Sequence, residues 1–190
     1  MKIILTAVVL LFAHLATAQA PTGDLHSEIE VWSGGGHSVP GGTSHTGVWN
    51  LGVRHGWVLT NPHGPGFLSG QFEYAVDVVP AYAIFQPANT AFGAGINPFN
   101  VKWLFTPHGH VAPYIELGGG VLFTNHNVPT RTSAINFTPG AAMGVHFLGG
   151  KLAWTAELRY QHISNAGLAY YNPGINTLQL RLGIGKFSRR

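Results

Sequence analysis

Hydrophobic and polar residues alternate along most of this 190-residue sequence. A period of two is typical of β-strands that have one apolar and one polar face. Stretches rich in glycine, proline and asparagine separate the alternating segments, as turns do between the strands of β-hairpins. The pattern predicts about eight strands, at residues 27–34, 46–59, 67–79, 90–105, 111–124, 133–148, 152–165 and 176–187.

The fourth segment changes phase along its length. Phe92 and Ile96 share one parity, whereas Val101 has the other. An Asn97-Pro98 step lies between them, and proline has no N–H to donate to a strand ladder. The sequence therefore predicts a β-bulge at this step, which restores the apolar face after the change of phase.

Charged residues fall almost entirely on the polar parity of the predicted strands. Six of the seven acidic residues and four basic residues lie there, so we expect them to form ion pairs on the inside of a closed sheet. Inward-facing glycines leave room for these long side chains. The residues of this set are Glu28, Glu30, Glu73, Asp77, Glu116, Glu157, Arg54, Lys102, Arg159 and Arg181.

The amino-acid composition indicates which fold class these strands form. Only 9% of the residues are charged, against about 25% in soluble domains, while 12% are aromatic and 26 residues are glycine. No segment after the first twenty residues approaches 18 consecutive apolar residues. An even number of alternating strands with few charges predicts an all-β protein, an eight-stranded antiparallel transmembrane β-barrel whose interior is filled by side chains.

The first residues are typical of a secretory signal peptide. Lys2 precedes an apolar run at 3–15, and Ala16-Thr17-Ala18 provides an A-x-A cleavage site. We therefore expect a signal peptide at 1–18, a single barrel domain at 19–190 and a location in the bacterial outer membrane. There is no cysteine, which excludes thiol catalysis, and no basic stripe, so nucleic acid is not an expected partner.

The strand at 152–165 carries polar chemistry on its apolar side. His162 and Ser164 share the parity of Trp154, Leu158 and Tyr160. Two residues apart on one strand, they point the same way, which in a membrane barrel is toward lipid. Polar groups on a lipid-facing surface are costly unless they have a function.

The next strand brings a third polar residue to the same place. Asn176 has the parity of Leu178 and Leu180, so in an antiparallel hairpin it lies beside His162 and Ser164. A serine becomes nucleophilic when an imidazole removes its proton, and a third group must orient that imidazole. The alternative interpretation is a hydrogen-bonded cluster at the rim of the barrel without catalysis. Residues predicted to stabilise an oxyanion are Asn165, Ala166 and Gly167.

At these residues the sequence resembles the lipid A 3-O-deacylase family of outer-membrane esterases. The resemblance rests on the run at 162–167, His-Ile-Ser-Asn-Ala-Gly, with Asn172 and Gly174 following, and more broadly on segments 113–120 and 137–139. It implies an eight-stranded barrel that removes the acyl chain at position 3 of lipid A. By the same resemblance, Ser164 is the nucleophile and His162 the general base.

One position departs from the family pattern. Asn176 stands fourteen residues after the histidine, where characterised members have a glutamate. The sequence thus leaves two hypotheses: an outer-membrane esterase acting on lipid A or lipopolysaccharide, and a non-enzymatic structural or adhesin-like barrel whose triad has decayed. It leaves the oligomeric state open, a homodimer included.

No cofactor is expected for either hypothesis, and the ester hydrolysis needs no metal. His108 and His110 have the alternating spacing of a metal-binding pair. A third ligand is not evident near them in the sequence, so we interpret this segment as a solvated turn.

Overall fold

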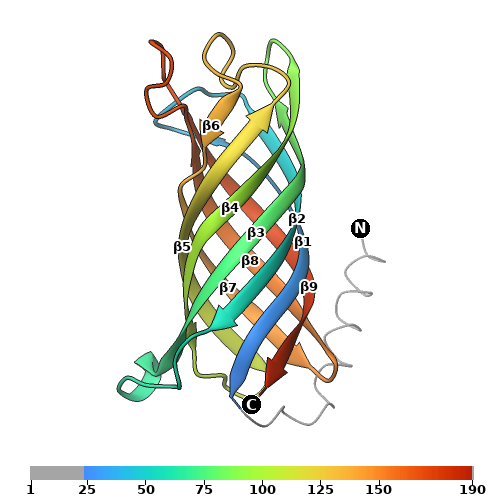
Figure 1. Cartoon of the computed structure of the whole chain (residues 1–190), viewed down its shortest axis with the longest axis vertical. Coiled ribbons are helices and arrows are strands. Elements are labelled where there is room, and N and C mark those ends of the chain that lie inside the picture. The colour runs from blue at the N-terminus through green and yellow to red at the C-terminus, as the bar shows by residue number, and fades with distance from the viewer. Residues whose placement is uncertain (1–23, 190) are drawn as a thin grey trace, which may run out of the picture.

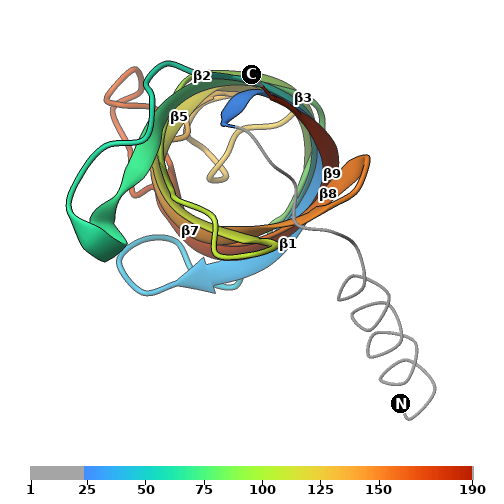
Figure 2. The same cartoon turned by 90° about the horizontal axis from the view of Figure 1, so that it is seen from below.

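A computed structural model describes residues 24–189, which form a closed antiparallel barrel (Figure 1). Around the barrel the strand order is β4-β3-β2-β1-β9-β8-β7-β5, and β4 pairs with β5 to close the ring (Figure 2). The strands are β1 (Leu25–Val39), β2 (Gly47–Val58), β3 (Gly70–Phe85), β4 (Thr90–Phe105), β5 (Val111–Thr124), β6 (Ile135–Phe137), β7 (Gly140–Gly149), β8 (Leu152–Ile163) and β9 (Ile175–Arg189).

The short β6 and the longer β7 act as one interrupted strand. Both pair with β5, at different heights of the barrel. Pro139 lies between them, and a proline cannot donate to the ladder. The barrel is therefore eight-stranded, and the predicted fold class is confirmed. The predicted signal peptide at 1–18 lies outside the described residues.

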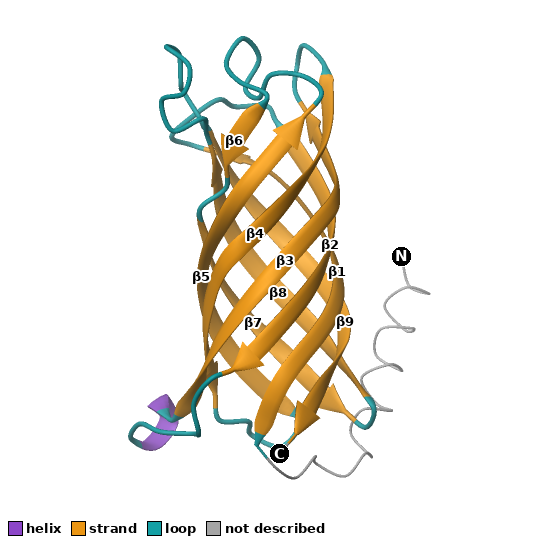
Figure 3. Ribbon diagram, viewed as in Figure 1, coloured by secondary structure: helices purple, strands orange, loops and turns teal. Residues whose placement is uncertain are grey.

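Three predicted boundaries are wrong by three or more residues, all near prolines or glycines. The first strand, predicted to end at residue 34, continues through Gly35 and Gly36 to Val39. The loop expected from Pro80 is strand as far as Phe85, because the register shift between Val79 and Tyr82 accommodates the proline in a bulge. The expected start of the third strand is instead a 3-10 turn, Gly66–Leu68 (Figure 3). The bulge predicted at Asn97-Pro98 is confirmed by a register shift between Ile96 and Phe99.

Inward and outward faces follow the predicted parities. Large apolar side chains are exposed on the outer wall, among them Leu117, Leu158 and Leu180, while every charged residue of the predicted interior set is buried. Among residues 24–189, no helix is long and apolar enough to cross a membrane.

Ion pairs fill the middle of the barrel, as the charge pattern predicts. Arg54 lies 2.7 Å from Asp77 and 2.6 Å from Glu116. Arg159 lies 2.5 Å from the same Glu116 and 2.7 Å from Glu157. One carboxylate thus links two guanidinium groups contributed by strands on different sides of the barrel.

The connections separate into two ends. Residues 40–46, 86–89, 125–134 and 164–174 connect strands at the end drawn uppermost in Figure 1. Turns at 106–110 and 150–151 lie at the opposite end, together with the 59–69 connection, the start of β1 and the end of β9. The last residues of β8 and the first of β9 therefore reach the upper rim of the barrel wall.

Candidate active site

The histidine near the end of β8 pairs with the asparagine near the start of β9. His162 and Asn176 are direct partners in the antiparallel register, so their side chains share one face of the wall. His162 Nδ1 lies 2.6 Å from Asn176 Oδ1. An amide oxygen only accepts hydrogen bonds, so the ring donates its Nδ1 proton and keeps the lone pair on Nε2 free to accept another.

Ser164 lies one residue beyond β8 and continues its ladder. The Phe137 N–H donates to the Ser164 carbonyl at 2.7 Å, and the Ser164 N–H donates to the Phe137 carbonyl at 3.1 Å. The strand alternation therefore holds, and the serine shares the face of His162, with their Cβ atoms about 7 Å apart. Within residues 24–189, Ser164 Oγ makes no hydrogen bond, so the hydroxyl is free to turn toward Nε2.

The site is shielded although it lies on the outer wall. Ser164 is 8% exposed and Asn176 is 7% exposed. The neighbouring outward positions on β8, Leu158 and Tyr160, are more than 40% exposed. Asn176 is thus buried amid an apolar wall, which reduces competition from water and strengthens its hydrogen bond to the half-buried His162.

Backbone amides cluster in the turn after Ser164. The Gly167 N–H donates to Asn165 Oδ1 at 2.9 Å, and the Asn165 N–H donates to Asn172 Oδ1 at 3.2 Å. Of the three predicted oxyanion residues, Ala166 alone has a backbone N–H without a partner within the described chain. Ala166 also has a φ of 51°, a strained conformation for a residue with a side chain and one that concentrates at functional sites.

Gly174 packs directly against the imidazole. Its φ is +65°, and a Cβ atom added there would lie 2.6 Å from His162 Cε1 and 3.2 Å from Nε2. Any side chain at this position would push the ring. The absence of a side chain at Gly174 therefore determines where the imidazole ring lies in the barrel wall.

For the ester hydrolysis that the sequence predicts, we expect Gly174→Ala to lower the rate by roughly 10- to 100-fold, because in enzymes a displacement of about 1 Å at a reacting group has effects of this size. The measurement is the initial rate on purified, folded barrel. Gly150→Ala is the matched control, since Gly150 has a φ of +54° but open space around its Cβ position. Equal rates for the two variants would show that the ring position is unimportant.

An apolar groove begins beside the serine on the outer wall. Phe137, which pairs with Ser164, is one of its lining residues, and the groove has a volume of about 510 Å³. Its lining is almost entirely hydrocarbon and glycine backbone from β4, β5 and the β6–β7 break. The remaining lining includes Pro98, Phe99, Val101, Leu117, Val121 and Pro139.

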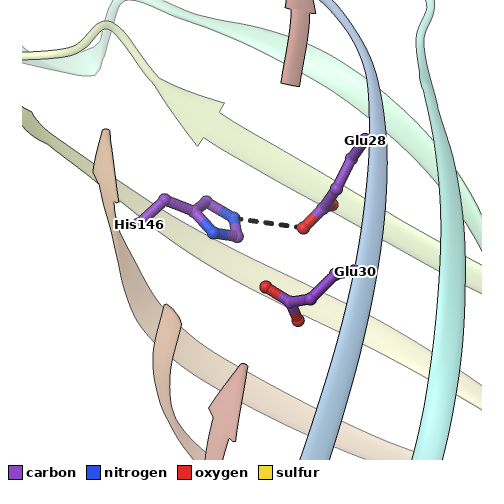
Figure 4. Close-up of side chains that lie close together, drawn as sticks. All are labelled: Glu28, Glu30 and His146. Atoms are coloured by element: carbon purple, nitrogen blue, oxygen red, sulfur yellow. Dashed lines mark ion pairs between the residues drawn. The ribbon is translucent and has the colours of Figure 1, made fainter. Parts of the chain in front are cut away.

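A second polar cluster lies inside the barrel, where Glu28, Glu30 and His146 come within 4.8 Å of one another (Figure 4). Lys102 Nζ donates to Glu28 Oε2 at 2.7 Å and lies 3.4 Å from His146 Nε2. His146 Nδ1 lies 2.8 Å from Thr155 Oγ1, which in turn hydrogen-bonds Glu30. Lys102 thus pairs with Glu28, and Thr155 connects His146 to Glu30, so this cluster belongs to the interior ion-pair network.

Three residues of the site were not assigned to it by the sequence. Phe137 pairs with Ser164, the Pro139 carbonyl accepts the His162 N–H at 2.8 Å, and the Pro40 carbonyl lies 3.4 Å from Asn176 Nδ2. All three are distant in sequence and reach the site through strand register and barrel closure. The Pro-Gly-Gly run at 40–42 signals a tight loop, but nothing in it indicates what the loop contacts.

Comparisons with known proteins identify a matching family and two solved structures that are similar to this chain. A family model described as lipid A 3-O-deacylase (PagL) matches residues 48–185. The crystal structure of the outer membrane enzyme PagL matches with a TM-score of 0.63 and 21% identity, over 81% of this chain and 97% of that one. Neisserial surface protein A matches with a TM-score of 0.50 and 15% identity, over 84% and 94%. No curated protein sequence matches the chain.

Proposed function

The chain belongs to the lipid A 3-O-deacylase (PagL) family of the bacterial outer membrane, and on that premise we propose that it is a serine esterase that removes the ester-linked acyl chain at the 3-O position of lipid A. The observation that carries the proposal is the 2.6 Å contact between His162 and Asn176 on the face that Ser164 shares. This contact leaves Nε2 free to act as a base, on the same lipid-facing side of β8 as Ser164.

The proposed chemistry is acyl transfer to the serine and then to water. Ser164 Oγ attacks the ester carbonyl carbon while its proton passes to His162 Nε2. The oxyanion forms next to the unpartnered Ala166 N–H, a donor of the kind that stabilises such charge. Collapse breaks the bond between the carbonyl carbon and the sugar oxygen, which takes the proton from Nε2. Water then attacks the acyl-serine through the same base, releasing the fatty acid and restoring the serine.

The groove supplies a place for the acyl chain. It starts at Phe137, directly opposite Ser164, and runs over apolar wall. Because lipid tails are as apolar as this lining, the groove gains little from hydrophobic transfer. Its contribution is instead to hold the ester at the serine, which is a positioning effect.

Charge at the upper rim suits an anionic lipid headgroup. The connections at 40–46, 86–89, 125–134 and 164–174 contain neither aspartate nor glutamate, and Arg131 is their one permanently charged residue. Repulsion of an anionic glycolipid is therefore absent at this rim. Transmembrane barrels have short periplasmic turns and longer extracellular loops. The connections at this rim are the longer ones on average, which supports a site at the outer leaflet, where lipopolysaccharide lies.

We expect Val121→Trp, which fills the groove, to lower kcat/KM for a long-chain substrate by about 10-fold while changing hydrolysis of a short, soluble ester by less than about twofold. Val53→Trp on another part of the outer wall is the control, since Val53 is also exposed there. The comparison uses both substrates on all three proteins. An equal loss on short and long substrates would exclude the groove as the acyl site.

Mass spectrometry of lipid A tests the proposed function. Lipid A from bacteria that express the full chain should lack one hydroxyacyl group relative to the same host without it. The alternative, a non-enzymatic outer-membrane barrel with a decayed triad, requires unchanged lipid A in cells where the folded barrel is present.

A further inference from the structure

We propose that the β1–β2 loop (residues 40–46) is a positioning element for His162, and that Asn176 is the orienting residue this loop is built to hold rather than the remnant of a lost carboxylate. The inference deepens the proposed function and rests on it. It is carried by the contacts that the loop makes with Asn176 and with Gly174, the two residues that touch the imidazole.

The loop decides which way the amide points. Asn176 Nδ2 lies 3.4 Å from the Pro40 carbonyl oxygen, and Asn176 Oδ1 lies 2.6 Å from His162 Nδ1. A carbonyl oxygen can only accept, so the NH₂ group must face Pro40 and the amide oxygen must face the ring. A flipped amide would place two acceptors together and present NH₂ to the ring, which would move the imidazole proton to Nε2 and abolish the base.

The loop also forms a hydrogen bond with Gly174, the second residue that contacts the imidazole. The Thr43 N–H donates to the Gly174 carbonyl at 2.9 Å. A Cβ atom at Gly42 would lie 2.8 Å from that carbonyl oxygen. At Gly41, whose φ is +106°, a Cβ atom would lie 2.7 Å from Asn176 Nδ2. The two glycines therefore allow the backbone to approach the amide closely enough for the Pro40 carbonyl to reach it.

These surroundings match an amide better than a carboxylate. A carboxylate at position 176 would present two acceptor oxygens, one of them toward the Pro40 carbonyl, which has no proton to offer. The usual weakness of asparagine in a triad is that it stabilises the wrong tautomer of the histidine. Here the Pro40 carbonyl removes that weakness, because it holds the amide with its oxygen toward the ring.

The tautomer of His162 can be read without any substrate, by ¹⁵N NMR of histidine-labelled barrel in micelles near neutral pH. We expect a neutral ring protonated at Nδ1 in the wild type and a substantial Nε2-protonated population in Gly41→Ala. Gly109→Ala is the control, since Gly109 also has positive φ but open space. An Nε2-protonated wild type, or a Gly41→Ala spectrum identical to the wild type, would overturn the inference.

Kinetics on two substitutions at 176 complete the test. Asn176→Leu should lower kcat about 100-fold or more with KM changed less than about threefold, and Asn176→Asp should stay within about tenfold of the wild type. A gain of more than tenfold in Asn176→Asp, or unchanged kcat in Asn176→Leu, contradicts the proposed role. Should the wild type hydrolyse nothing yet show the Nδ1 tautomer, the deacylase proposal fails and the positioning role stands.

Discussion

Replacing Ser164 by alanine should lower kcat/KM for lipid A deacylation by roughly four to six orders of magnitude, as loss of a serine nucleophile does in other serine hydrolases. The hydroxyl oxygen is the only heavy atom that this substitution removes. The His162–Asn176 hydrogen bond, the groove at Phe137 and the backbone pairing of residue 164 with residue 137 do not involve it. The expected loss is therefore in chemistry, with binding and folding retained.

Ser33→Ala is the matched control for this prediction. Ser33 also lies on the wall outside the polar interior, where it donates to the Asn50 carbonyl at 3.2 Å and accepts from Trp49 Nε1 at 3.1 Å. No histidine pairs with it. Its removal should leave the rate of fatty-acid release within about twofold. Comparable activity in Ser164→Ala and Ser33→Ala would assign the nucleophile elsewhere.

Replacing Glu116 by glutamine should lower the free energy of unfolding by about 3–5 kcal/mol, the usual cost of breaking a buried ion pair from one side. Glu116 accepts from Arg54 at 2.6 and 2.9 Å and from Arg159 at 2.5 Å. A glutamine keeps the shape but turns an NH₂ group toward guanidinium donors. Two guanidinium groups that are buried in the lumen then share too few acceptors.

Denaturant-induced unfolding of the barrel in lipid bilayers measures this loss. Leu182→Val is the control, since Leu182 is 60% exposed on the outer wall and its substitution should cost about 1 kcal/mol or less, as transfer of one methylene between similar apolar surroundings is small. A Glu116→Gln barrel as stable as this control would mean that the interior network contributes nothing to stability.

Alternation made the barrel predictable from sequence. With a period of two, each outward Leu or Trp specifies the inward residue beside it, so the interior positions of Glu116 and Arg159 follow from parity alone. The prolines limited how accurately the strand boundaries could be predicted. Pro80 is accommodated in a bulge of β3 and Pro139 interrupts β6–β7, and the sequence pattern distinguishes poorly between a proline that ends a strand and one that bends it.

The part of the site that lies within the β8–β9 hairpin was predictable from the sequence. His162 and Ser164 share a strand and Asn176 follows on the next, so their parity was enough to bring them together. The contacts of Phe137 and Pro40 with this group depend on pairing between distant strands and on closure of β1 against β9. Register of that kind is set by the whole barrel, and the orientation of one amide depends on a carbonyl 136 residues away in sequence.

Covalent capture of the nucleophile tests the central claim most directly. Purified barrel in micelles is treated with a long-chain fluorophosphonate, and peptide mass spectrometry locates the adduct. We expect one adduct, on Ser164, and its loss in His162→Ala although the serine is still present. An adduct on another residue, no adduct at all, or equal labelling of Ser164 with and without His162 would contradict a serine activated by this histidine.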